Sequence, residues 1–536
     1  MALMAALPMF ALGQVNRYFV FLKDKVGTNY SIDRPEEFLS VRSVERRANQ
    51  GISVTDSDLP VSEDYISQVS QTGADVFFAS KWFNGLLIQA EEAEVGSISA
   101  LSFVDSVTLV AQGERLQGET LKVGRLNVFG NRIKSDKETE AQNSMLSIDD
   151  MHSREFRGEG ITVAVFDGGF AGVDDIDYFQ HVFDDERMLA TRDFVTNTGN
   201  VYQYDDHGTR VFSAIAGLNE GEFVGTAYNS NFILCITEDV ESETRIEEYN
   251  WLLGAEFADS VGVDIINTSL GYNLFDDPQM NYTHDDLDGQ TAIISIASNM
   301  AAEKGILLIA SAGNEGNNSW VRVTPPADSP SVLAVGGVNG SGVVSAFSSL
   351  GPTADERIKP DVVALSSNVT LINSQGNLTS GNGTSFSAPL VAGLAAGIWQ
   401  ANPELTNFEL IEVIKLSADN ADSPNSSLGY GVPDFIGALP NPVLSVEDIF
   451  EGRIKVYPNP FRGNRIFIDL DASFVGDDLS IEFFSLSGSL LAQRTYSNQF
   501  FTETVQFEID QDIVPGTYIL RLSNTSKITE VKLLKY

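Results

Sequence analysis

Gly-Thr-Ser-Phe-Ser-Ala-Pro, residues 383–389, leads directly into the apolar run Leu-Val-Ala-Gly-Leu-Ala-Ala at residues 390–396. This pattern predicts a buried helix with Ser385 in its first turn. Backbone N–H groups and the positive end of the helix dipole would then lie beside the Ser385 hydroxyl, as chemistry through an oxyanion requires. A serine in front of an apolar helix is more often a simple N-cap. Its meaning therefore depends on whether a base, and a group that orients the base, exist elsewhere in the chain.

Both groups occur upstream of this run. Residues 160–166, Gly-Ile-Thr-Val-Ala-Val-Phe, are typical of a buried strand, and Asp167 follows them. Sheets of α/β proteins place their sites at the carboxyl ends of such strands. His207 follows forty residues later, and it alone of the four histidines stands in a glycine-flanked helix start. A single histidine would ordinarily be a surface or core residue. Together with Asp167 and Ser385, His207 is a candidate general base.

A fourth polar group follows another strand pattern. Residues 310–316, Ala-Ser-Ala-Gly-Asn-Glu-Gly, come directly after the apolar run at 305–309. We expect the side-chain amide of Asn314 to donate a hydrogen bond to a developing oxyanion. The candidate catalytic residues, in chain order, are therefore Asp167, His207, Asn314 and Ser385.

These four pieces, in this order, resemble the pattern of the subtilisin-like serine proteases, and the resemblance covers about residues 150–440. It implies an α/β fold, a subtilisin-like catalytic domain with a mostly parallel sheet flanked by helices. In the implied mechanism Ser385 attacks the peptide carbonyl, His207 takes and later returns the proton, and Asp167 holds the imidazole in the useful tautomer. Asn314 and the Ser385 N–H would stabilise the oxyanion. The resemblance thus implies a serine endopeptidase.

The same resemblance extends to substrate contacts. Residues 264–271, Asp-Ile-Ile-Asn-Thr-Ser-Leu-Gly, look like the strand whose outer edge pairs with the substrate and lines the specificity pocket. The segment after the strand at 305–309 would supply the facing wall. The substrate-binding residues implied in this way are Ser269, Leu270, Gly271, Ser311, Ala312 and Gly313. Their small side chains leave the side-chain preference of the pocket open.

Several positions near the candidate triad depart from the commonest pattern of this family, Gly168, Phe212 and Ser213 among them. Arg210 stands where a second histidine is frequent, and Phe386 follows the nucleophile where many relatives carry methionine. None of these is one of the four catalytic positions, all of which are intact. The alternative function is a catalytically inactive cell-surface binding or adhesion protein on the protease fold. An amidase or esterase on the same triad is a remoter alternative, because acyl transfer does not specify the leaving group.

Charge and cysteine content narrow the context. Lys and Arg together number 34 against 74 Asp and Glu, so the formal net charge is −40. Such an acidic chain is a poor partner for nucleic acid, suits a soluble secreted protein, and would attract cationic peptides. Cys235 is the single cysteine, which excludes an intrachain disulfide, and its apolar surroundings predict a buried side chain.

The N-terminal part of the chain is expected to be processed. Residues 1–13 have the apolar core and small terminal residues of a signal peptide and are too short to span a membrane. Residues 15–112 predict a small α+β domain, with strands at 17–22 and 82–88 and a helix at 35–50. In position and pattern this domain resembles the inhibitory propeptide of subtilisin-like proteases. The alternative is a permanent N-terminal domain.

The polar residues 113–147 would form an exposed linker and processing region, which leaves residues 148–442 for the peptidase domain. No stretch of the chain is long and apolar enough to predict a transmembrane segment. Structural calcium is common in the resembling family, but no local spacing names its ligands, so no metal site or certain cofactor is predicted. Protein or peptide substrates are the expected partners.

In the C-terminal residues 443–536 the pattern changes to short segments of alternating apolar and polar residues, separated by turn residues. This pattern predicts an all-β sandwich. The runs Lys-Val-Tyr-Pro-Asn-Pro at 455–460 and Pro-Gly-Thr-Tyr-Ile-Leu-Arg-Leu at 515–522 resemble the C-terminal sorting domain of the type IX secretion system of Bacteroidetes. This resemblance implies export through the periplasm to the medium or the cell surface, with the type IX machinery as a partner. The alternative is an accessory domain that binds carbohydrate or protein.

Overall fold

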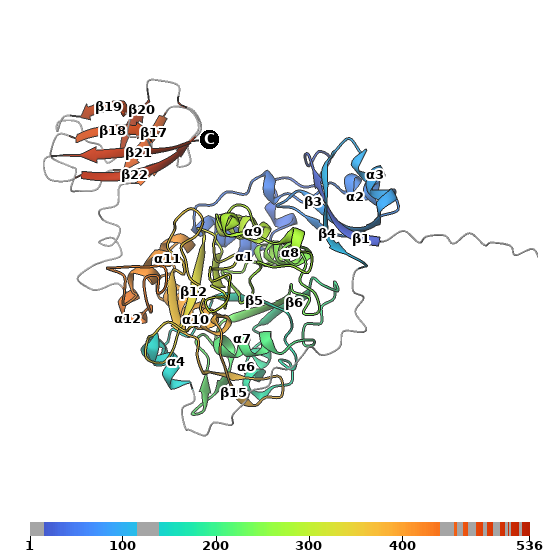
Figure 1. Ribbon diagram of the computed structural model, residues 1–536. Helices are drawn as coiled ribbons and strands as arrows, with labels where there is room; N and C mark the ends of the chain where they lie inside the picture. The colour runs from blue at the N-terminus through green and yellow to red at the C-terminus, as the bar shows by residue number, and fades with distance from the viewer. Residues whose placement is uncertain are drawn as a thin grey trace, which may run out of the picture. The chain divides into compact units, whose positions relative to one another are not determined.

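The computed structural model describes residues 15–114 and 139–439 continuously and, between residues 455 and 535, chiefly the strands (Figure 1). The chain forms two compact units, Met1–Leu439 and Pro440–Tyr536. The expected signal peptide, residues 1–13, and most of the expected processing region lie outside the described residues.

The N-terminal domain is an antiparallel sheet in the strand order β2-β3-β1-β4, and helices α2 and α3 pack against it. Apolar side chains on both faces of β1 serve two cores, because successive residues of a strand point to opposite faces. Tyr18 and Val20 face the small core of this domain, whereas Phe19 joins the large core of the peptidase region. The strands and helices are β1 Val15–Leu22, α1 Val41–Asn49, α2 Glu63–Ser70, β2 Asp75–Ser80, β3 Gly85–Glu91, α3 Glu92–Ser99 and β4 Val104–Gln112.

A seven-stranded sheet forms the centre of the peptidase region. Its strand order is β13-β12-β11-β10-β5-β9-β6, and every pairing is parallel. Most of its strands are continuous runs of buried apolar residues because helices cover both faces. Their carboxyl ends meet at one edge, where the expected site residues lie. The strands are β5 Thr162–Asp167, β6 Met188–Asp193, β9 Asn231–Ile236, β10 Ile265–Thr268, β11 Leu307–Ser311, β12 Val332–Val338 and β13 Val362–Leu365.

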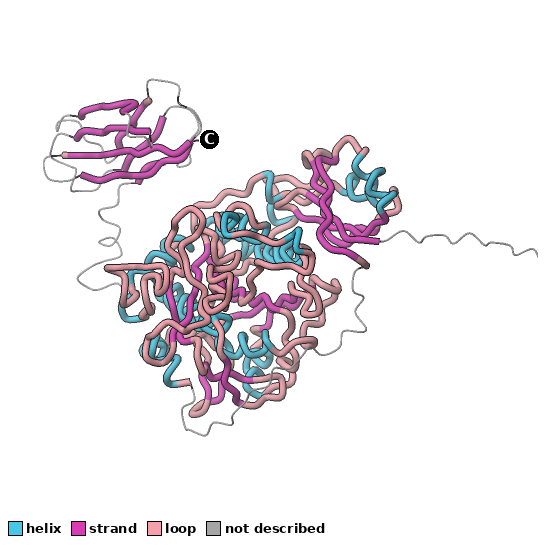
Figure 2. The backbone as a smooth tube through the Cα atoms, viewed as in Figure 1, coloured by secondary structure: helices cyan, strands magenta, loops and turns pink. Residues whose placement is uncertain are grey.

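Two pairs of long helices cover this sheet (Figures 1 and 2). Helix α10 contacts α7 and strands β10 to β13 on one face, and α8 and α9 contact each other on the opposite face. Helix α10 is apolar nearly all round because it is buried over almost its whole length. The expectation of an α/β domain with a mostly parallel sheet flanked by helices is confirmed. The helices are α4 Glu140–Met145, α5 Ile148–Ser153, α6 Gln180–Asp184, α7 His207–Ala216, α8 Ile246–Val261, α9 Ile293–Glu303, α10 Thr384–Ala401, α11 Asn407–Leu416 and α12 Phe435–Ala438.

Two short strand pairs complete the first unit, β7 Leu218–Asn219 with β8 Phe223–Val224, and β14 Val369–Ile372 with β15 Leu378–Gly381. In the described parts of the chain, no helix combines the length and the apolarity of a membrane span. Cys235 is fully buried in β9, as expected.

The N-terminal domain packs on helix α8. The backbone N–H groups of Lys81 and Trp82, in the turn between β2 and β3, donate to the carboxylate of Glu256 at 2.9 and 3.1 Å. The ring of Phe19 stacks on Tyr249, with ring centroids 4.6 Å apart. Hydrogen bonds to Glu256 and aromatic stacking on Tyr249 therefore hold the N-terminal domain on the same helix.

Charged side chains reinforce this contact. The fully buried Asp259 of α8 lies 2.6 Å from Arg46, 2.8 Å from Arg47 and 3.1 Å from Lys81. Burial raises the pKa of Asp259, but these three cations outweigh burial and lower it to about 2. A buried carboxylate with three cationic partners is satisfied only while the N-terminal domain is in place.

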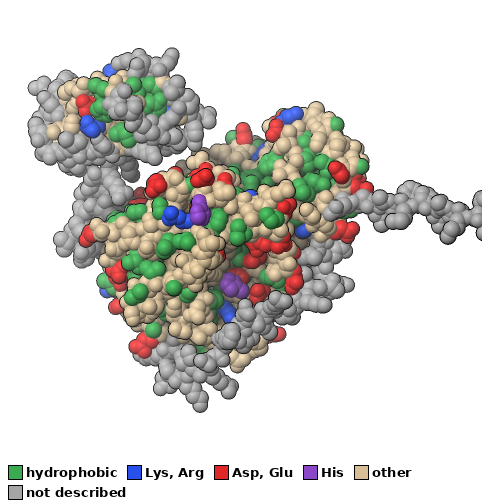
Figure 3. Space-filling view, viewed as in Figure 1, with side chains coloured by type: hydrophobic (Ala, Val, Ile, Leu, Met, Phe, Trp, Pro, Cys, Tyr) green, Lys and Arg blue, Asp and Glu red, His purple; other side chains and the backbone are tan. Residues whose placement is uncertain are grey.

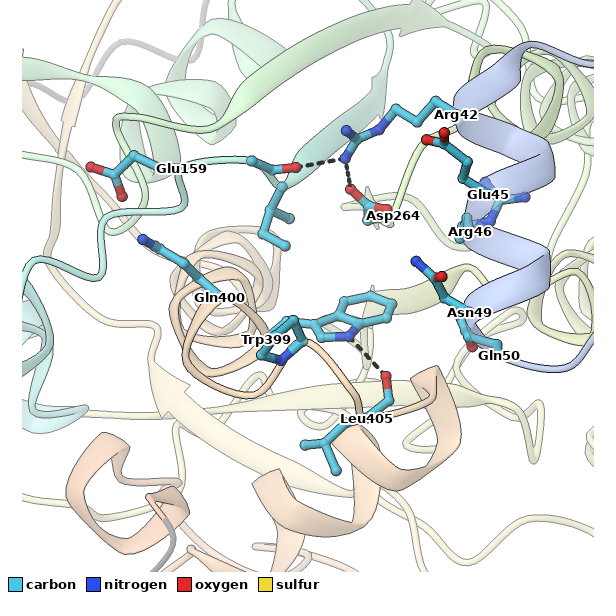
Figure 4. A pocket seen from close by; sticks show the side chains of 13 residues that line it. Arg42, Glu45, Arg46, Asn49, Gln50, Glu159, Asp264, Trp399, Gln400 and Leu405 are labelled. Atoms are coloured by element: carbon cyan, nitrogen blue, oxygen red, sulfur yellow. Dashed lines mark hydrogen bonds and ion pairs between the residues drawn. The ribbon is translucent and has the colours of Figure 1, made fainter.

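Helix α1 also contacts the peptidase region near the starts of strands β5 and β10 (Figure 4). Arg42 donates to the carboxylate of Asp264 and to the carbonyl of Gly160, beside a cavity of about 300 Å³ that Trp399 and Gln400 also line. This cavity lies at the junction of the two domains, at the amino-terminal side of the sheet. It is a feature of the domain contact and does not include a candidate catalytic residue.

The second unit consists of two antiparallel sheets, in the orders β16-β17-β20 and β19-β18-β21-β22. Buried residues of both sheets, among them Ile468, Phe507, Phe483 and Leu520, form one core, as in a sandwich. The strand at 490–496 was not expected from the sequence. The strands are β16 Lys455–Tyr457, β17 Arg465–Asp469, β18 Leu479–Ser485, β19 Leu490–Tyr496, β20 Thr504–Glu508, β21 Gly516–Ser523 and β22 Ile528–Lys535.

Candidate active site

Strand β5 and helix α7 bring Asp167 and His207 together. Asp167 is the last residue of β5 and only 1% exposed, and its carboxylate oxygens lie 2.9 and 3.0 Å from Nδ1 of His207. The N–H of Gly168 donates to the same carboxylate at 2.9 Å. Because the carboxylate favours a proton on Nδ1, Nε2 of the neutral ring is left as an acceptor. A general base requires this arrangement.

Gly208 allows helix α7 to start this close to the aspartate. A Cβ atom on Gly208 would lie 2.3 Å from the carbonyl oxygen of Gly169 and 2.9 Å from Cβ of Asp167. Any larger residue would push the helix start, and His207 with it, away from β5. The glycine beside the histidine is therefore a steric requirement of the Asp167–His207 pair.

The carboxylates around His207 control its charge. Burial lowers the pKa of His207, but Asp167, with smaller contributions from Glu238 and Asp205, outweighs burial and raises it to about 9. The side chain remains 33% exposed, so its free edge faces the solvent side of the site. A proton that reaches this imidazole is thus well stabilised, as a general base in acyl transfer needs.

Ser385 is the second residue of helix α10 and is 8% exposed. The ring of the next residue, Phe386, lies 5.7 Å from that of His207 between centroids, so the helix start and the histidine are neighbours. Within the described chain, the hydrogen bond from Ser385 Oγ goes to the carbonyl of Ser269 at 3.2 Å rather than to His207. Bonds between nucleophile and base are often long without substrate and tighten in the complex.

Asn314 lies beyond strand β11 and is held by the residue before the candidate nucleophile. Its Oδ1 accepts from the N–H of Thr384 at 2.9 Å and from the Thr384 hydroxyl at 3.2 Å. With the oxygen engaged, Nδ2 is the donor end, and it lies 3.6 Å from the position that a Cβ on Gly383 would take. The amide donor and the N–H groups at the start of α10 are thus next to each other, as an oxyanion site requires.

The six expected substrate-binding residues lie at the ends of two neighbouring parallel strands. Residues 269–271 follow β10, Ser311 is the last residue of β11, and residues 312–313 follow it. Ser269 Oγ donates to the carbonyl of Ser385 at 2.8 Å, so this edge is tied to the nucleophile. Thr324 packs against both segments, because a Cβ on the glycine of either one would come within 2.9 Å of its Oγ1. Small residues are therefore needed here for packing.

An acidic cluster that the sequence analysis did not identify lies at the edge of this site. One carboxylate oxygen each from Glu238, Glu243 and Glu247 lie within 4.8 Å of one another. They come from the segment between β9 and α8 and from the first turn of α8. Oxygen ligands of this kind suit hard cations. The signal in the sequence was the density of acids in residues 238–248, Glu-Asp-Val-Glu-Ser-Glu-Thr-Arg-Ile-Glu-Glu.

Comparisons with known proteins agree with this geometry. Residues 17–122 match the peptidase S8 propeptide domain of Bacteroidota, and residues 455–535 match the secretion system C-terminal sorting domain. The expected propeptide and sorting domain are confirmed, and the sorting domain marks a secreted or cell-surface protein. Residues 158–432 match the subtilase family, whose members are serine-type endopeptidases.

Individual relatives are similar over the same region. Subtilisin amylosacchariticus of Bacillus subtilis subsp. amylosacchariticus is 32% identical over 271 residues, half of this chain and 63% of the relative. Subtilisin of Bacillus pumilus is 31% identical over 52% of this chain and 90% of its own length. The solved structure of MycP1 from the ESX-1 type VII secretion system is 24% identical, with a TM-score of 0.46, over 59% of this chain and 90% of that one. The chain thus spans somewhat less than two thirds of the first relative. Because the family match covers more than half of its 536 residues, this chain belongs to the subtilase family.

Proposed function

We propose that this protein is a secreted serine endopeptidase that hydrolyses peptide bonds through an acyl-enzyme. The observation that carries the proposal is the hydrogen-bonded pair of Asp167 and His207, 2.9 Å apart, next to a helix start that holds Ser385. The subtilase match supports the same activity. No feature of the described residues favours the inactive binding protein over the peptidase.

In the proposed reaction, His207 Nε2 takes the proton of the Ser385 hydroxyl as the oxygen attacks the substrate carbonyl. Asp167 keeps the second ring nitrogen protonated and stabilises the imidazolium that forms. His207 then gives the proton to the leaving amine, and the acyl group stays on Ser385. Water, activated by the same histidine, releases the acid product and restores the enzyme.

The oxyanion of each tetrahedral intermediate would accept hydrogen bonds from Asn314 Nδ2 and from the backbone N–H of Ser385. The contact of Asn314 with Thr384 supports this role, because it directs the amide nitrogen toward the nucleophile. Losing one donor of this kind costs about 10²–10³ in kcat. The substrate would lie along residues 269–271, with its side chain between that segment and residues 311–313.

The N-terminal domain would keep the enzyme latent until cleavage within residues 113–147. Helix α4 belongs to the peptidase region, because its Gln142 accepts from the N–H of Thr370 and donates to the carbonyl of the same residue. A cut before Thr139 would leave that helix in place. The type IX machinery would then be the partner that exports the chain through its C-terminal domain.

A fluorophosphonate probe tests the proposal. We expect the probe to label the processed wild-type protein at Ser385, and Ser385→Ala to abolish labelling and lower casein hydrolysis at least about 10⁴-fold. Ser387→Ala is the matched control, because Ser387 lies two residues further along α10 and donates only to a backbone carbonyl of the helix. Undiminished casein hydrolysis by Ser385→Ala would refute the assignment. An intact protein that neither takes the probe nor cleaves casein would instead be the inactive binding protein.

A further inference from the structure

The acidic cluster of Glu238, Glu243 and Glu247 lies directly beside the candidate catalytic residues. Glu238 Oε2 is 3.7 Å from the position that a Cβ on Gly168 would take, and Gly168 follows Asp167. The cluster therefore borders the Asp167–His207 pair. In Figure 3, acidic side chains gather below the N-terminal domain, near a histidine.

The three glutamates of the cluster crowd one another, and no cation of the described residues forms an ion pair with them. Burial, followed by the neighbouring carboxylates Asp167 and Glu243, raises the pKa of Glu238 to about 8. Burial and then Asp276 and Glu248 raise the pKa of Glu243 to about 7. Carboxylates held this close repel one another, and a cation between them would remove that repulsion.

Two buried polar groups at the acidic cluster lack hydrogen-bond partners among the described residues. Glu247 is fully buried, and its Oε2 has no hydrogen-bond partner in the described chain. The hydroxyl of Tyr272, which is 1% exposed, likewise has none there, and the carboxylates that act on Tyr272 most strongly are Glu247, Glu238 and Glu243. Orphaned buried groups of this kind indicate a ligand that completes the site.

The chain itself brings one cation to this cluster. Arg17 of strand β1 is 8% exposed, its Nε is without a partner among the described residues, and the charges that act on it most are Asp239 and Glu247. Its Nη2 donates to the carbonyl of Gln112 at 3.2 Å. Arg17 and Gln112 line a cavity of about 280 Å³ together with Glu243. The propeptide thus already presents a guanidinium to the acids.

Two observations indicate where a substrate would meet these acids. Tyr272, on whose hydroxyl the three carboxylates act, directly follows the expected substrate edge at residues 269–271, so the cluster adjoins the end of that edge. Gln112, the propeptide residue at the cavity, precedes the expected processing region 113–147. The chain that reaches the cluster therefore lies on the acyl side of the bond to be cut.

We propose that Glu238, Glu243 and Glu247 form a subsite for a lysine or arginine side chain of the substrate, two to four residues before the scissile bond. The inference rests on the proposed peptidase function and names its substrate class, cationic peptides. A divalent metal is the other cation that carboxylates bind, but the guanidinium of Arg17 in the same cavity favours a cationic side chain. The charge-assisted contact replaces the repulsion between the glutamates and holds the peptide along residues 269–271.

Peptides that differ in one side chain test this subsite. In internally quenched peptides, lysine is compared with its uncharged analogue norleucine at each of four positions before and two positions after the scissile bond. We measure kcat/KM with the processed enzyme at pH 9, which is above the pKa of about 8 of Glu238 and of about 7 of Glu243, and at which lysine is still charged. The expected lysine-to-norleucine ratio is about tenfold at one or two acyl-side positions and about one at the others.

Variants connect the ratio to the cluster. Glu243→Gln and Glu238→Gln should each bring the ratio toward one, whereas Glu241→Gln, an exposed acid on the same segment, should leave it unchanged. Thermal unfolding shows whether each variant is folded. The inference is overturned by a ratio below about two at every position, or by a ratio that both cluster variants keep. Failure to cleave any peptide would overturn the proposed function, and the subsite with it.

Discussion

His207 makes the activity of this protein sensitive to pH. Its neutral form is the general base, and the Asp167 carboxylate outweighs burial to raise the His207 pKa to about 9. The protonated fraction therefore grows as the pH falls below 9, and the base is lost in the same proportion. We expect kcat/KM to rise about tenfold per pH unit up to about pH 9 and then level off. The pH profile of kcat/KM on an uncharged peptide measures this.

A Glu238 variant serves as a control for this pH profile, because the charge of Glu238 contributes to the raised pKa of His207. Glu238→Gln should move the midpoint of the profile to lower pH, and Glu241→Gln should leave it in place. A profile that is flat from pH 6 to pH 9 would contradict the assignment of His207 as the base.

Helix α8 carries a charged contact between the propeptide and the peptidase region. Asp259 of this helix faces Arg46, Arg47 and Lys81 of the N-terminal domain, all within 3.1 Å. Asp259→Asn leaves Arg46 and Lys81 buried without this counter-charge, whereas Arg47 keeps Asp58 at 3.0 Å. Removing one partner of a buried ion pair typically costs about 3–5 kcal/mol. We therefore expect propeptide retention after processing to weaken at least about 100-fold. The full-length chain is allowed to process itself, and gel filtration then measures the fraction of cleaved propeptide that stays bound to the peptidase.

The mature enzyme provides the internal control for this prediction, because Asp259 has no propeptide partner after release. Its activity on a small peptide should therefore be close to that of the wild type. Asp355→Asn, which removes a half-exposed ion pair with Arg357 in the peptidase region, should leave propeptide retention unchanged. Tight retention by the Asp259 variant would mean that the other contacts hold the propeptide, among them Phe19 on Tyr249 and the N–H groups of Lys81 and Trp82 on Glu256.

The candidate catalytic residues and the sorting domain lie in different units of the chain. All four candidate catalytic residues lie in the first unit, and the C-terminal strands have a hydrophobic core of their own. Deleting residues 443–536 should therefore leave peptidase activity in protein expressed in the cytoplasm or refolded. In the native host the truncated enzyme should stay in the periplasm, and activity assays on periplasm, cell surface and medium locate it. Export of the truncated enzyme at the normal level would point to an accessory binding domain.

Local pattern predicted the central elements well. Strand β5 and helix α10 are continuous apolar runs of characteristic length, and burial on all sides leaves such runs few alternatives. The N-terminal domain was harder to predict. The helix expected at 35–50 begins only at Val41, because Ser40 accepts from the N–H of Ser43 and caps it there. Strand β19 has mixed exposure and no clear alternation of apolar and polar residues, so the two-residue period of a strand could not be recognised in its sequence.

The order and the types of Asp167, His207, Asn314 and Ser385 are properties of the sequence, and each is placed by a strand end or helix start that local periodicity predicts. Contacts between distant segments came only from the tertiary structure. Thr384 orients Asn314 across 70 residues, and Ser385 bonds to Ser269 across 116. The glutamates and Tyr272 meet because the start of α8 lies beside the segment after β10, and Arg17 reaches them because the propeptide packs on α8. Periodicity reports which face of an element is buried, but it does not say which residues the opposing face supplies.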